Sequence, residues 1–333
     1  MKVGIVGCGA IASRAHVPAF VKAGANIVAV ADMDLRRAQD FAKKFSIPAV
    51  YDDYRQLLRG DVELVSVCSP PDTHAQIAID AAEMGKHILV EKPMATNLED
   101  AKRIVRACET KHVKLCVMHQ YRFIPSVQEA KARVTDGRLG QVLSIQMVAH
   151  PQFPLRWSDA AWLYEKWSLL DDVGVHLLDV LSYLTGNGPR HVSAIARDTS
   201  GKMGFYDDIH VMIELTDSSV TFLDLSWVEG TTELTSQIFG TAGKIDLDLR
   251  QNFLRESHGY ITPFDDLSST MHKSWQTMAS ALTGTYFKGT LIYHDVVIRA
   301  FMDSIAQDAE SPVGPREGEK VVEFLEAIKQ AAH

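Results

Sequence analysis

Three small residues near the start of the chain have the spacing of a dinucleotide-binding turn. Gly7, Gly9 and Ala12 directly follow the apolar run Val3–Val6. Gly7 would permit a tight turn, Gly9 would let the backbone approach a pyrophosphate, and Ala12 would let the next helix pack closely on the strand. The N-terminus of that helix would offer N–H groups and a partial positive charge to the phosphates. The residues expected to contact the dinucleotide in this turn are Gly7, Gly9, Ala10, Ile11 and Ala12.

Asp32 indicates which dinucleotide is bound. It directly follows a second apolar run, Ile27–Ala31, and the next residue is Met33. A carboxylate at this position accepts hydrogen bonds from the ribose hydroxyls and repels a 2′-phosphate, and Met33 supplies no cation to offset the repulsion. The sequence therefore favours NAD over NADP. The alternative is that Asp32 only caps the helix expected to begin near Leu35.

Glu91, Lys92 and Pro93 directly follow another apolar run, His87–Val90. Beside a bound nicotinamide, the Lys92 ammonium would hydrogen-bond a substrate hydroxyl and stabilise the alkoxide that develops. Glu91 would position Lys92 or contact the nicotinamide side, and Pro93 would fix the backbone, with a cis bond as one form. The alternative is an exposed turn with an ordinary pair of charges.

Asp172, His176 and Asp179 form a polar stripe in an otherwise apolar segment. Spacings of four and three place the three side chains along one face of a helix. A histidine there can act as a general base near neutral pH, with a neighbouring carboxylate to orient its ring. Two alternatives remain: a core histidine with satisfied hydrogen bonds, and a metal site made of all three side chains. The dinucleotide turn favours hydride transfer without a metal over both.

The elements that must position these groups change in type near residue 120. Up to that point short apolar runs alternate with amphipathic segments, which predicts a parallel sheet covered by helices on both faces. Such sheets bind ligands beyond the carboxyl ends of their strands. The strands expected there are Lys2–Val6, Ile27–Ala31, Leu64–Cys68, His87–Val90 and Leu115–Met118, and the helices are 10–23, Leu35–Phe45, Tyr54–Leu58, 74–84 and Leu98–Lys111.

After residue 120 the pattern predicts a largely antiparallel sheet with helices on one face. Its second face has enough apolar side chains to suggest a subunit interface. The strands expected are 141–149, 191–196, Ile209–Leu215, 220–228, 232–239 and 244–249, and the helices are 126–134, 173–184, 293–307 and 318–331.

Composition excludes several classes of protein. The 333 residues, 46% of them hydrophobic, suffice for two domains with cores of their own. A net charge of −8 without a basic cluster argues against a nucleic-acid partner. No apolar run approaches the roughly 18 residues of a membrane span, and we expect no secretory signal, because the N-terminus enters a strand at once. Because no run is long enough to span a membrane, we expect no membrane partner. The four cysteines lack C-x-x-C spacing, so we expect buried thiols in a reduced cytoplasm.

Taken together, these motifs resemble the Gfo/Idh/MocA family of NAD(P)-dependent oxidoreductases, named for glucose–fructose oxidoreductase and inositol dehydrogenase. The resemblance implies an α/β protein whose residues 1–120 form a Rossmann NAD(P)-binding domain with a doubly wound parallel sheet. Residues 121–333 would form an α+β domain with a large, open, mostly antiparallel sheet that binds the substrate and joins a homodimer or homotetramer. The segments that match the family are Gly7–Ala12, Asp32, 69–74, 91–93, 121–123, 172–179, 239–243 and 312–317.

The resemblance also implies roles for individual residues. Lys92 and His176 would face the substrate carbon, and Asp172 would bind the substrate or orient the group that does. His176 would take the hydroxyl proton while Lys92 steadies the oxygen, as a hydride passes between NAD and a sugar, cyclitol or related polyol. Besides the turn residues, the expected cofactor contacts are Asp32, Ser69, Pro70, Pro71, His74, Glu91 and Lys92.

Several side chains are candidates for the substrate pocket beyond Asp172 and His176. Aromatic rings beside hydrogen-bonding groups suit a sugar or cyclitol, although Arg122 would also suit a carboxylate or phosphate. The alternative is that the aromatic residues of segment 150–157 complete the core. Where the family often has a glycine-rich stretch, this chain has Trp167–Asp171, which leaves the substrate unnamed. The further candidates are Gln120, Arg122, Phe153 and Trp157, with Gln152 beside them.

Two other functions remain open at this point. One is a sensor that keeps the nucleotide without catalysis, against which the presence of Lys92 and His176 argues. The other is an enzyme that retains NAD and uses transient oxidation for glycoside cleavage or epimerisation. Accumulation of NADH would distinguish a dehydrogenase from the enzyme that retains NAD.

Overall fold

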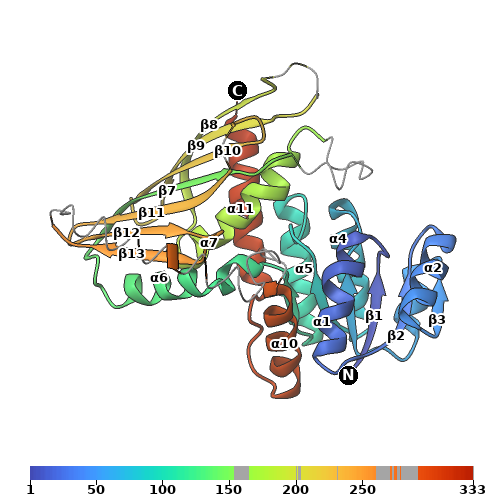
Figure 1. The fold of residues 1–333 in the computed structure, drawn as a ribbon. Helices are drawn as coiled ribbons and strands as arrows, with labels where there is room; N and C mark the ends of the chain where they lie inside the picture. Colours follow the sequence, from blue (N-terminus) through green and yellow to red (C-terminus); the bar gives the residue numbers. More distant parts are fainter. Residues whose placement is uncertain are drawn as a thin grey trace. The chain divides into compact units, whose positions relative to one another are not determined.

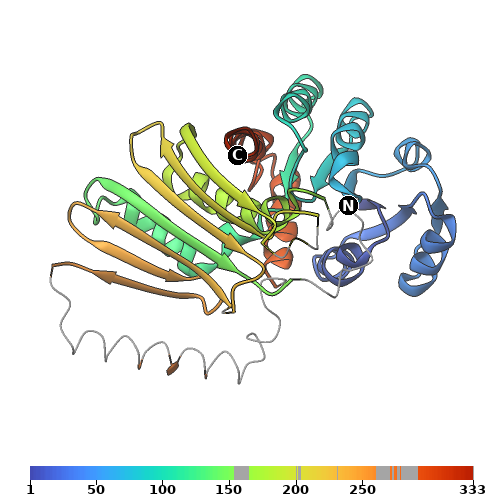
Figure 2. The same cartoon turned by 90° about the horizontal axis from the view of Figure 1, so that it is seen from above.

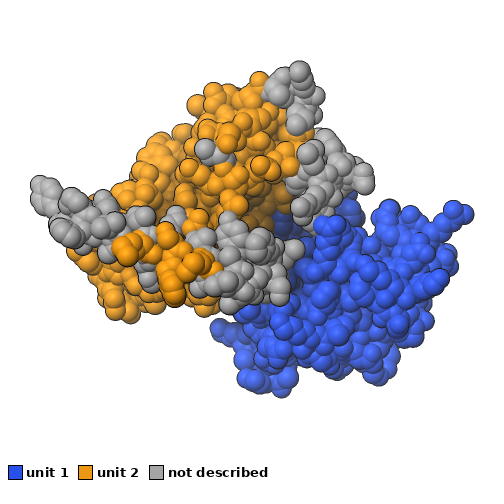
Figure 3. Space-filling model, in the orientation of Figure 1, with its two compact units in different colours: residues 1–120, 291–322 blue, residues 121–290, 323–333 orange. Residues whose placement is uncertain are grey.

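The computed structural model describes residues 1–153, 165–199, 201, 204–230, 232–259, 271, 274–275, 278 and 292–332. The chain divides into two compact units, which Figure 3 shows in two colours. The first comprises residues 1–120 and 291–322, and the second comprises residues 121–290 and 323–333. None of the helices in the described part of the chain combines the length and the hydrophobicity that a membrane span requires.

The first unit is built on a six-stranded parallel sheet with the strand order β3-β2-β1-β4-β5-β6 (Figures 1 and 2). This is the order of a Rossmann fold, and the predicted parallel sheet is confirmed. The central strands are buried along almost their whole length, because helices cover both faces. The strands are β1 (Lys2–Val6), β2 (Asn26–Ala31), β3 (Ala49–Tyr51), β4 (Leu64–Val67), β5 (His87–Val90) and β6 (Leu115–Val117).

Capping residues fix two helices of this unit at the predicted bounds. Asp34 accepts hydrogen bonds from two main-chain N–H groups at the start of α2, and Asn97 accepts one at the start of α5. The first helix contains a π-helical turn, η1, directly after the glycine turn. The helical elements are η1 (Ala12–His16), α1 (Val17–Lys22), α2 (Leu35–Phe45), α3 (Tyr54–Arg59), α4 (Pro71–Glu83) and α5 (Leu98–Lys111).

Helix α10 (Ile292–Ala306) belongs to the first unit, although the sequence predicted it in the second. It packs against η1 and α1, where Lys22 Nζ lies 2.6 Å from Asp295 Oδ2. The segment that follows is tied to the sheet, because the Val117 N–H donates to the Val313 carbonyl. These contacts join segments far apart in the sequence, so no local pattern could predict them. Along the chain, the first unit passes into the second after Gln120.

The second unit contains a seven-stranded sheet with the order β13-β12-β11-β7-β10-β9-β8. All neighbouring pairs are antiparallel except β7 with β10, so the mostly antiparallel sheet is confirmed. The strands are β7 (Val142–His150), β8 (Pro189–Arg197), β9 (Asp208–Leu215), β10 (Val220–Ser226), β11 (Glu233–Gly240), β12 (Lys244–Asp248) and β13 (Phe253–Ser257).

Helices lie on one face of this sheet, as Figure 2 shows. Helix α6 packs on β12, β13 and α7, and the π-helical turn η5 packs on β10. Along β9 the side chains alternate between buried ones on this face, such as Val211, and exposed ones on the other, such as Met212. The helical elements are η2 (Gln120–Phe123), α6 (Pro125–Thr135), η5 (Leu170–Gly174), α7 (Val175–Thr185) and α11 (Pro315–Ala331), of which residues 315–322 belong to the first unit.

Candidate functional site

The turn after β1 has the geometry that a bound dinucleotide needs. Gly7 has a φ of +91°, and a Cβ added there would lie 2.6 Å from backbone atoms of Cys68 and Ser69. At Gly9, by contrast, an added Cβ would meet no atom within 4 Å. Only glycine therefore fits the first position, while the second leaves room for a phosphate above the backbone. A helix starts at Ala10, and the fully buried Ala12 packs it closely on the sheet.

Asp32 supports the same turn. Its Oδ2 accepts a hydrogen bond from the Cys8 N–H at 2.9 Å, and its Oδ1 accepts one from the Asp34 N–H at 2.9 Å. The alternative that Asp32 caps α2 is wrong, because Asp34 is the capping residue. Each carboxylate oxygen accepts more than one hydrogen bond, so Asp32 retains capacity for ribose hydroxyls. Arg37 lies near, with Nη1 3.7 Å from Asp32 Oδ1.

His74 joins the loops that follow β4 and β5. It is 1% exposed, its Nδ1 lies 2.8 Å from the Pro93 carbonyl oxygen, and its Nε2 lies 2.9 Å from the Ser69 carbonyl oxygen. Burial lowers the pKa of His74, and the contacts with the two carbonyl groups oppose this shift without overcoming it. Ser69, Pro70 and Pro71 lie in the loop that it supports, and Pro71 is the first residue of α4.

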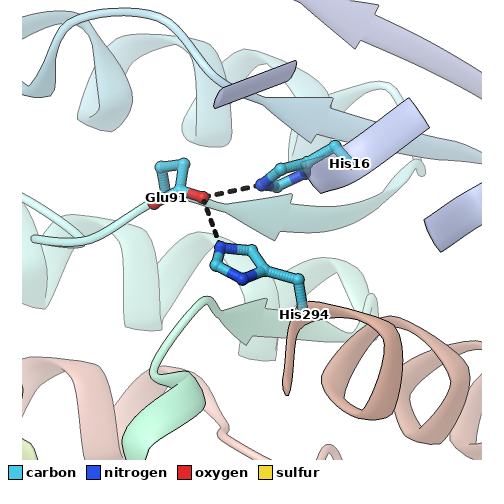
Figure 4. A group of neighbouring side chains, drawn as sticks. All are labelled: His16, Glu91 and His294. Carbon is cyan, nitrogen blue, oxygen red and sulfur yellow. Dashed lines mark hydrogen bonds and ion pairs between the residues drawn. The ribbon is translucent and has the colours of Figure 1, made fainter. Parts of the chain in front are cut away.

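Glu91 and Lys92 stand at the carboxyl end of β5, where the Lys92–Pro93 peptide bond is cis. Glu91 is buried and Lys92 is half-buried. Glu91 Oε1 lies 2.6 Å from His16 Nε2 (Figure 4). Burial opposes ionisation of Glu91, but its hydrogen bond and charge interaction with His16 outweigh burial and lower the pKa of Glu91 to about 2. Glu91 is therefore a carboxylate at neutral pH, and Lys92 is not part of an ordinary exposed charge pair.

The second unit has a cavity of about 350 Å³ that contains two of the predicted catalytic side chains, Asp172 and His176. Gly174, between them, lets η5 and α7 approach the sheet, since a Cβ there would lie 2.8 Å from side-chain carbons of Leu170 and Leu225. Acidic, basic and apolar side chains surround the cavity. Its lining residues are Tyr121, Pro151, Gln152, Asp172, Val173, His176, Trp227, Thr232, Glu233, Leu234 and Arg250.

The His176 ring is held by stacking. The Tyr121 and His176 rings are 4.2 Å apart between centroids with an interplanar angle of 10°. His176 is 8% exposed, so the ring reaches the cavity while most of its surface is packed. This arrangement can present an imidazole nitrogen to a hydroxyl group of a molecule in the cavity.

Asp179 has a different environment from Asp172. It is fully buried and forms an ion pair with Arg122 through two hydrogen bonds, one of them from Nε to Oδ2 at 3.1 Å. Its oxygens are therefore engaged by the guanidinium, which argues against a metal site of Asp172, His176 and Asp179. Among the described residues, the one cluster with three side chains at ligand distance is His16, Glu91 and His294.

Comparison with known proteins decides the family. Residues 1–119 match the family model described as "Oxidoreductase family, NAD-binding Rossmann fold", and residues 127–246 match the "GFO/IDH/MocA C-terminal domain". The inositol 2-dehydrogenase of Acidothermus cellulolyticus is 30% identical over 270 residues, which are 78% of this chain and 76% of the relative. The chain belongs to the Gfo/Idh/MocA family. The resemblance predicted from the motifs is thereby confirmed, as is an NAD-binding fold in the first unit.

Other relatives of the family act on different compounds. The D-apiose dehydrogenase of Paraburkholderia graminis is 28% identical over 222 residues, or 66% of this chain and 58% of the relative. The chain spans about half the length of the first three curated relatives it matches. The crystal structure of the WlbA dehydrogenase from Bordetella pertussis in complex with NADH and UDP-GlcNAcA has a TM-score of 0.82 at 22% identity, covering 99% of this chain and 95% of that one. This likeness concerns the fold.

Not all the residues predicted for the substrate pocket of this Gfo/Idh/MocA protein line the cavity. Arg122 is buried in its pair with Asp179, and Gln120 is 6% exposed. Phe153 is half-buried and packs against the rings of Phe205 and Trp227, the second of which lines the cavity. Trp157 lies outside the described residues. Gln152 does line the cavity.

Several cavity residues were not predicted from the sequence, among them Trp227, Glu233 and Arg250. Glu233 begins β11 and pairs with His150 at the end of β7, which brings it beside Gln152. An antiparallel pairing of the segments at 141–149 and 232–239 would have predicted this neighbour. Arg250 follows β12, and nothing in its local sequence distinguishes it from an ordinary turn residue.

Proposed function

We propose that this protein is an NAD-dependent dehydrogenase that transfers a hydride between NAD and a hydroxyl-bearing carbon of a sugar, cyclitol or related polyol. The observation that carries the proposal is the cavity with Asp172 and the stacked His176, in a chain whose other unit has the NAD-binding fold. Relatives named as dehydrogenases of inositol, D-apiose and levoglucosan support this substrate class.

The first unit would hold the cofactor by its turn and its strand ends. Gly7, Gly9 and the first residues of the helix would bind the pyrophosphate, and Asp32 the adenosine ribose. The loops at 69–74 and 91–93 would line the remaining length of the cofactor. When bound, NAD supplies the hydride acceptor, and the Asp32 charge disfavours the 2′-phosphate of NADP.

The proposed catalytic groups each have a separate task. His176 would accept the proton of the substrate hydroxyl as general base, and return it in the reverse direction. Lys92 would donate a hydrogen bond to the same oxygen and stabilise its developing negative charge. Asp172 would bind a neighbouring hydroxyl or orient His176. A cavity with side-chain carboxylates, an amide and aromatic rings suits the alternating hydroxyl and C–H surfaces of a polyol.

The outer face of the second sheet would join two or more copies of the chain. Ile195, Met212 and Phe222 are 57%, 47% and 45% exposed, and the strand register places all three on that face. Exposed apolar side chains gathered on one sheet face are typical of subunit contacts. We expect a homodimer or homotetramer by sedimentation, and dissociation on Phe222→Glu.

The test of the activity is a screen at the absorbance band of reduced nicotinamide. Purified protein is mixed with NAD or NADP and with inositols, D-apiose, levoglucosan and sugar acids. A substrate-dependent rise with NAD, faster than with NADP, is the expected result. If none of these compounds gives a rise while the protein keeps bound cofactor through purification, the dehydrogenase assignment is wrong and a sensor or retained-cofactor enzyme takes its place.

A further inference from the structure

Two histidines from distant parts of the chain approach the Glu91 carboxylate (Figure 4). His16 comes from η1, directly after the dinucleotide turn, and His294 comes from the first turn of α10. Their Nε2 atoms lie 2.6 Å and 3.8 Å from the same oxygen, Glu91 Oε1. All three side chains are at least nine-tenths buried. A carboxylate in such a place requires partners, because an isolated buried charge is costly.

The other oxygen of Glu91 contacts Lys92. The Lys92 main-chain N–H donates a hydrogen bond to Glu91 Oε2 at 3.2 Å. The carboxylate therefore joins two imidazoles on one side to the backbone of Lys92 on the other. Whatever fixes the carboxylate plane also restricts the backbone from which the Lys92 side chain starts.

Both histidines are themselves held in place. His16 Nδ1 lies 2.8 Å from the hydroxyl oxygen Oγ of Ser66, which is on strand β4. This oxygen lies 3.6 Å from Sγ of Cys68, the residue that directly follows β4. The helix that carries His294 is tied to α1, because Arg299 donates to the Lys22 carbonyl and Asp295 pairs with Lys22. Burial opposes a charge on His16, but Cys68 and Glu91 favour it, and together they raise the pKa of His16 to about 10.

We propose that His16 and His294 are positioning residues that hold the Glu91 carboxylate and thereby orient Lys92 for catalysis. This inference rests on the role of Lys92 under the proposed function. A hydrogen bond accounts for the His16–Glu91 contact better than a shared metal ion does. Two ligands of one zinc ion each lie about 2.0 Å from it and so are roughly 3 Å or more apart, whereas these atoms are at hydrogen-bond distance.

The experiment compares two kinds of substitution at each histidine. His16→Gln keeps an N–H group that reaches Glu91, whereas His16→Leu keeps the size and removes the donor. The same pair is made at His294, and His87→Gln, at the far end of β5, is the control. Turnover is measured with the polyol of the screen that gives the fastest NAD reduction, and cofactor affinity is measured with NADH by fluorescence. We expect His16→Leu to lower kcat about tenfold or more, with KM for the polyol and the Kd for NADH changing less than about threefold.

The Gln variants should recover most of this loss, and the His87 control should match the wild type. In a Lys92→Ala background, His16→Leu should cause no further loss, because it acts through Lys92. An additive loss in that background, or a Leu variant with wild-type kcat, overturns the inference. If Lys92→Ala itself keeps wild-type turnover, the proposed function fails instead, so the two failures are distinguishable.

A measurement without turnover covers the case in which a Leu variant does not fold. The side-chain ¹⁵N resonances of His16 in the intact wild-type protein should be those of a ring that carries a proton on Nε2, and should change in Glu91→Gln. A His16 ring without a proton on Nε2 in the wild type contradicts the arrangement, because such a ring cannot donate to Glu91. One equivalent of zinc per chain, with turnover lost on chelation, also overturns it in favour of a metal site.

Discussion

The two candidate regions for cofactor and substrate are built in opposite ways. In the first unit the groups at the strand ends are fixed by hydrogen bonds, such as Asp32 to the Cys8 N–H and Glu91 to His16. In the second unit the cavity is assembled by packing: Tyr121 stacks on His176, and Gly174 admits the helix to the sheet. Hydrogen bonds of fixed geometry suit a site that binds the same ligand in every member of a family. Packed side chains can be replaced by others of similar volume without loss of the fold, which suits a site whose ligand differs among relatives.

Both regions use the same local device to present polar groups. A π-helical turn, η1, ends at His16 in the first unit, and another, η5, contains Asp172 in the second. Such turns widen the helix by one residue and are frequent at functional sites. Each lies inside a longer helical run, since the two helices begin at Ala10 and Ser168, so the widened turn interrupts the regular spacing of the helix at the polar group.

The comparison predicts that catalysis can be removed without touching the cofactor site. His176→Ala deletes the proposed general base from the cavity, so kcat should fall about a hundredfold or more. The Kd for NADH should stay within about twofold, since His176 belongs to the packed region of the second unit. Steady-state kinetics and fluorescence titration check both values. A variant that turns over at the wild-type rate shows that another group takes the proton.

The converse change acts on the first unit alone. Gly9→Ala places a methyl group where a phosphate is expected, so the Kd for NADH should rise about thirtyfold, or roughly 2 kcal/mol. The melting temperature should stay unchanged, since an added Cβ meets no protein atom within 4 Å. Gly7→Ala is the matched contrast. It should destabilise the fold by about 2 kcal/mol or more, because it combines a positive φ with backbone clashes.

The strand-end groups of the first unit, here called the hydrogen-bonded region, were easier to predict from the sequence than the cavity of the second unit, here called the packed region. The candidate site residues of the hydrogen-bonded region directly follow apolar runs, and strand ends of a parallel sheet share one edge. Helices α2 and α5 were predicted at their exact bounds from their amphipathic runs, and the structure shows Asp34 and Asn97 as the caps at which they begin. Strand β3 was missed, since its three residues are only half-buried and lack a strong apolar signal.

The packed region was predicted in type and not in detail. The polar stripe at helical spacing pointed to Asp172 and His176, yet other residues that line the cavity lie as far along the chain as Arg250. Strand pairings across long loops decide these neighbours, and no local period records them. The same reason hid His294, whose position beside Glu91 depends on α10 packing against α1.

The pH dependence of the free energy of unfolding tests whether His16 is charged beside Glu91 in the first unit. The pKa of His16 is raised in the folded state, so the stabilisation is complete below the unfolded value near 6.5 and is lost as the pH rises toward about 10. Between pH 7 and pH 9 the free energy of unfolding of the wild type should therefore fall relative to His16→Gln, by at most about 1.4 kcal/mol per pH unit. Urea denaturation at three pH values measures this, with His87→Gln as control. Parallel curves for His16→Gln and wild type contradict a charged His16.

The smallest expected effect concerns the stacked ring in the second unit. Tyr121→Leu leaves an apolar side chain beside His176 but removes the flat surface that sets the angle of its ring, whereas Tyr121→Phe keeps the surface and removes only the hydroxyl. Loss of such a contact is worth about 1 kcal/mol, so kcat should fall about fivefold in the Leu variant and stay within about twofold in the Phe variant. An equal loss in both would assign the effect to the Tyr121 hydroxyl, and hence to a hydrogen bond. The substrate side would then be held in the same way as the cofactor side, and the contrast between the two regions would not stand.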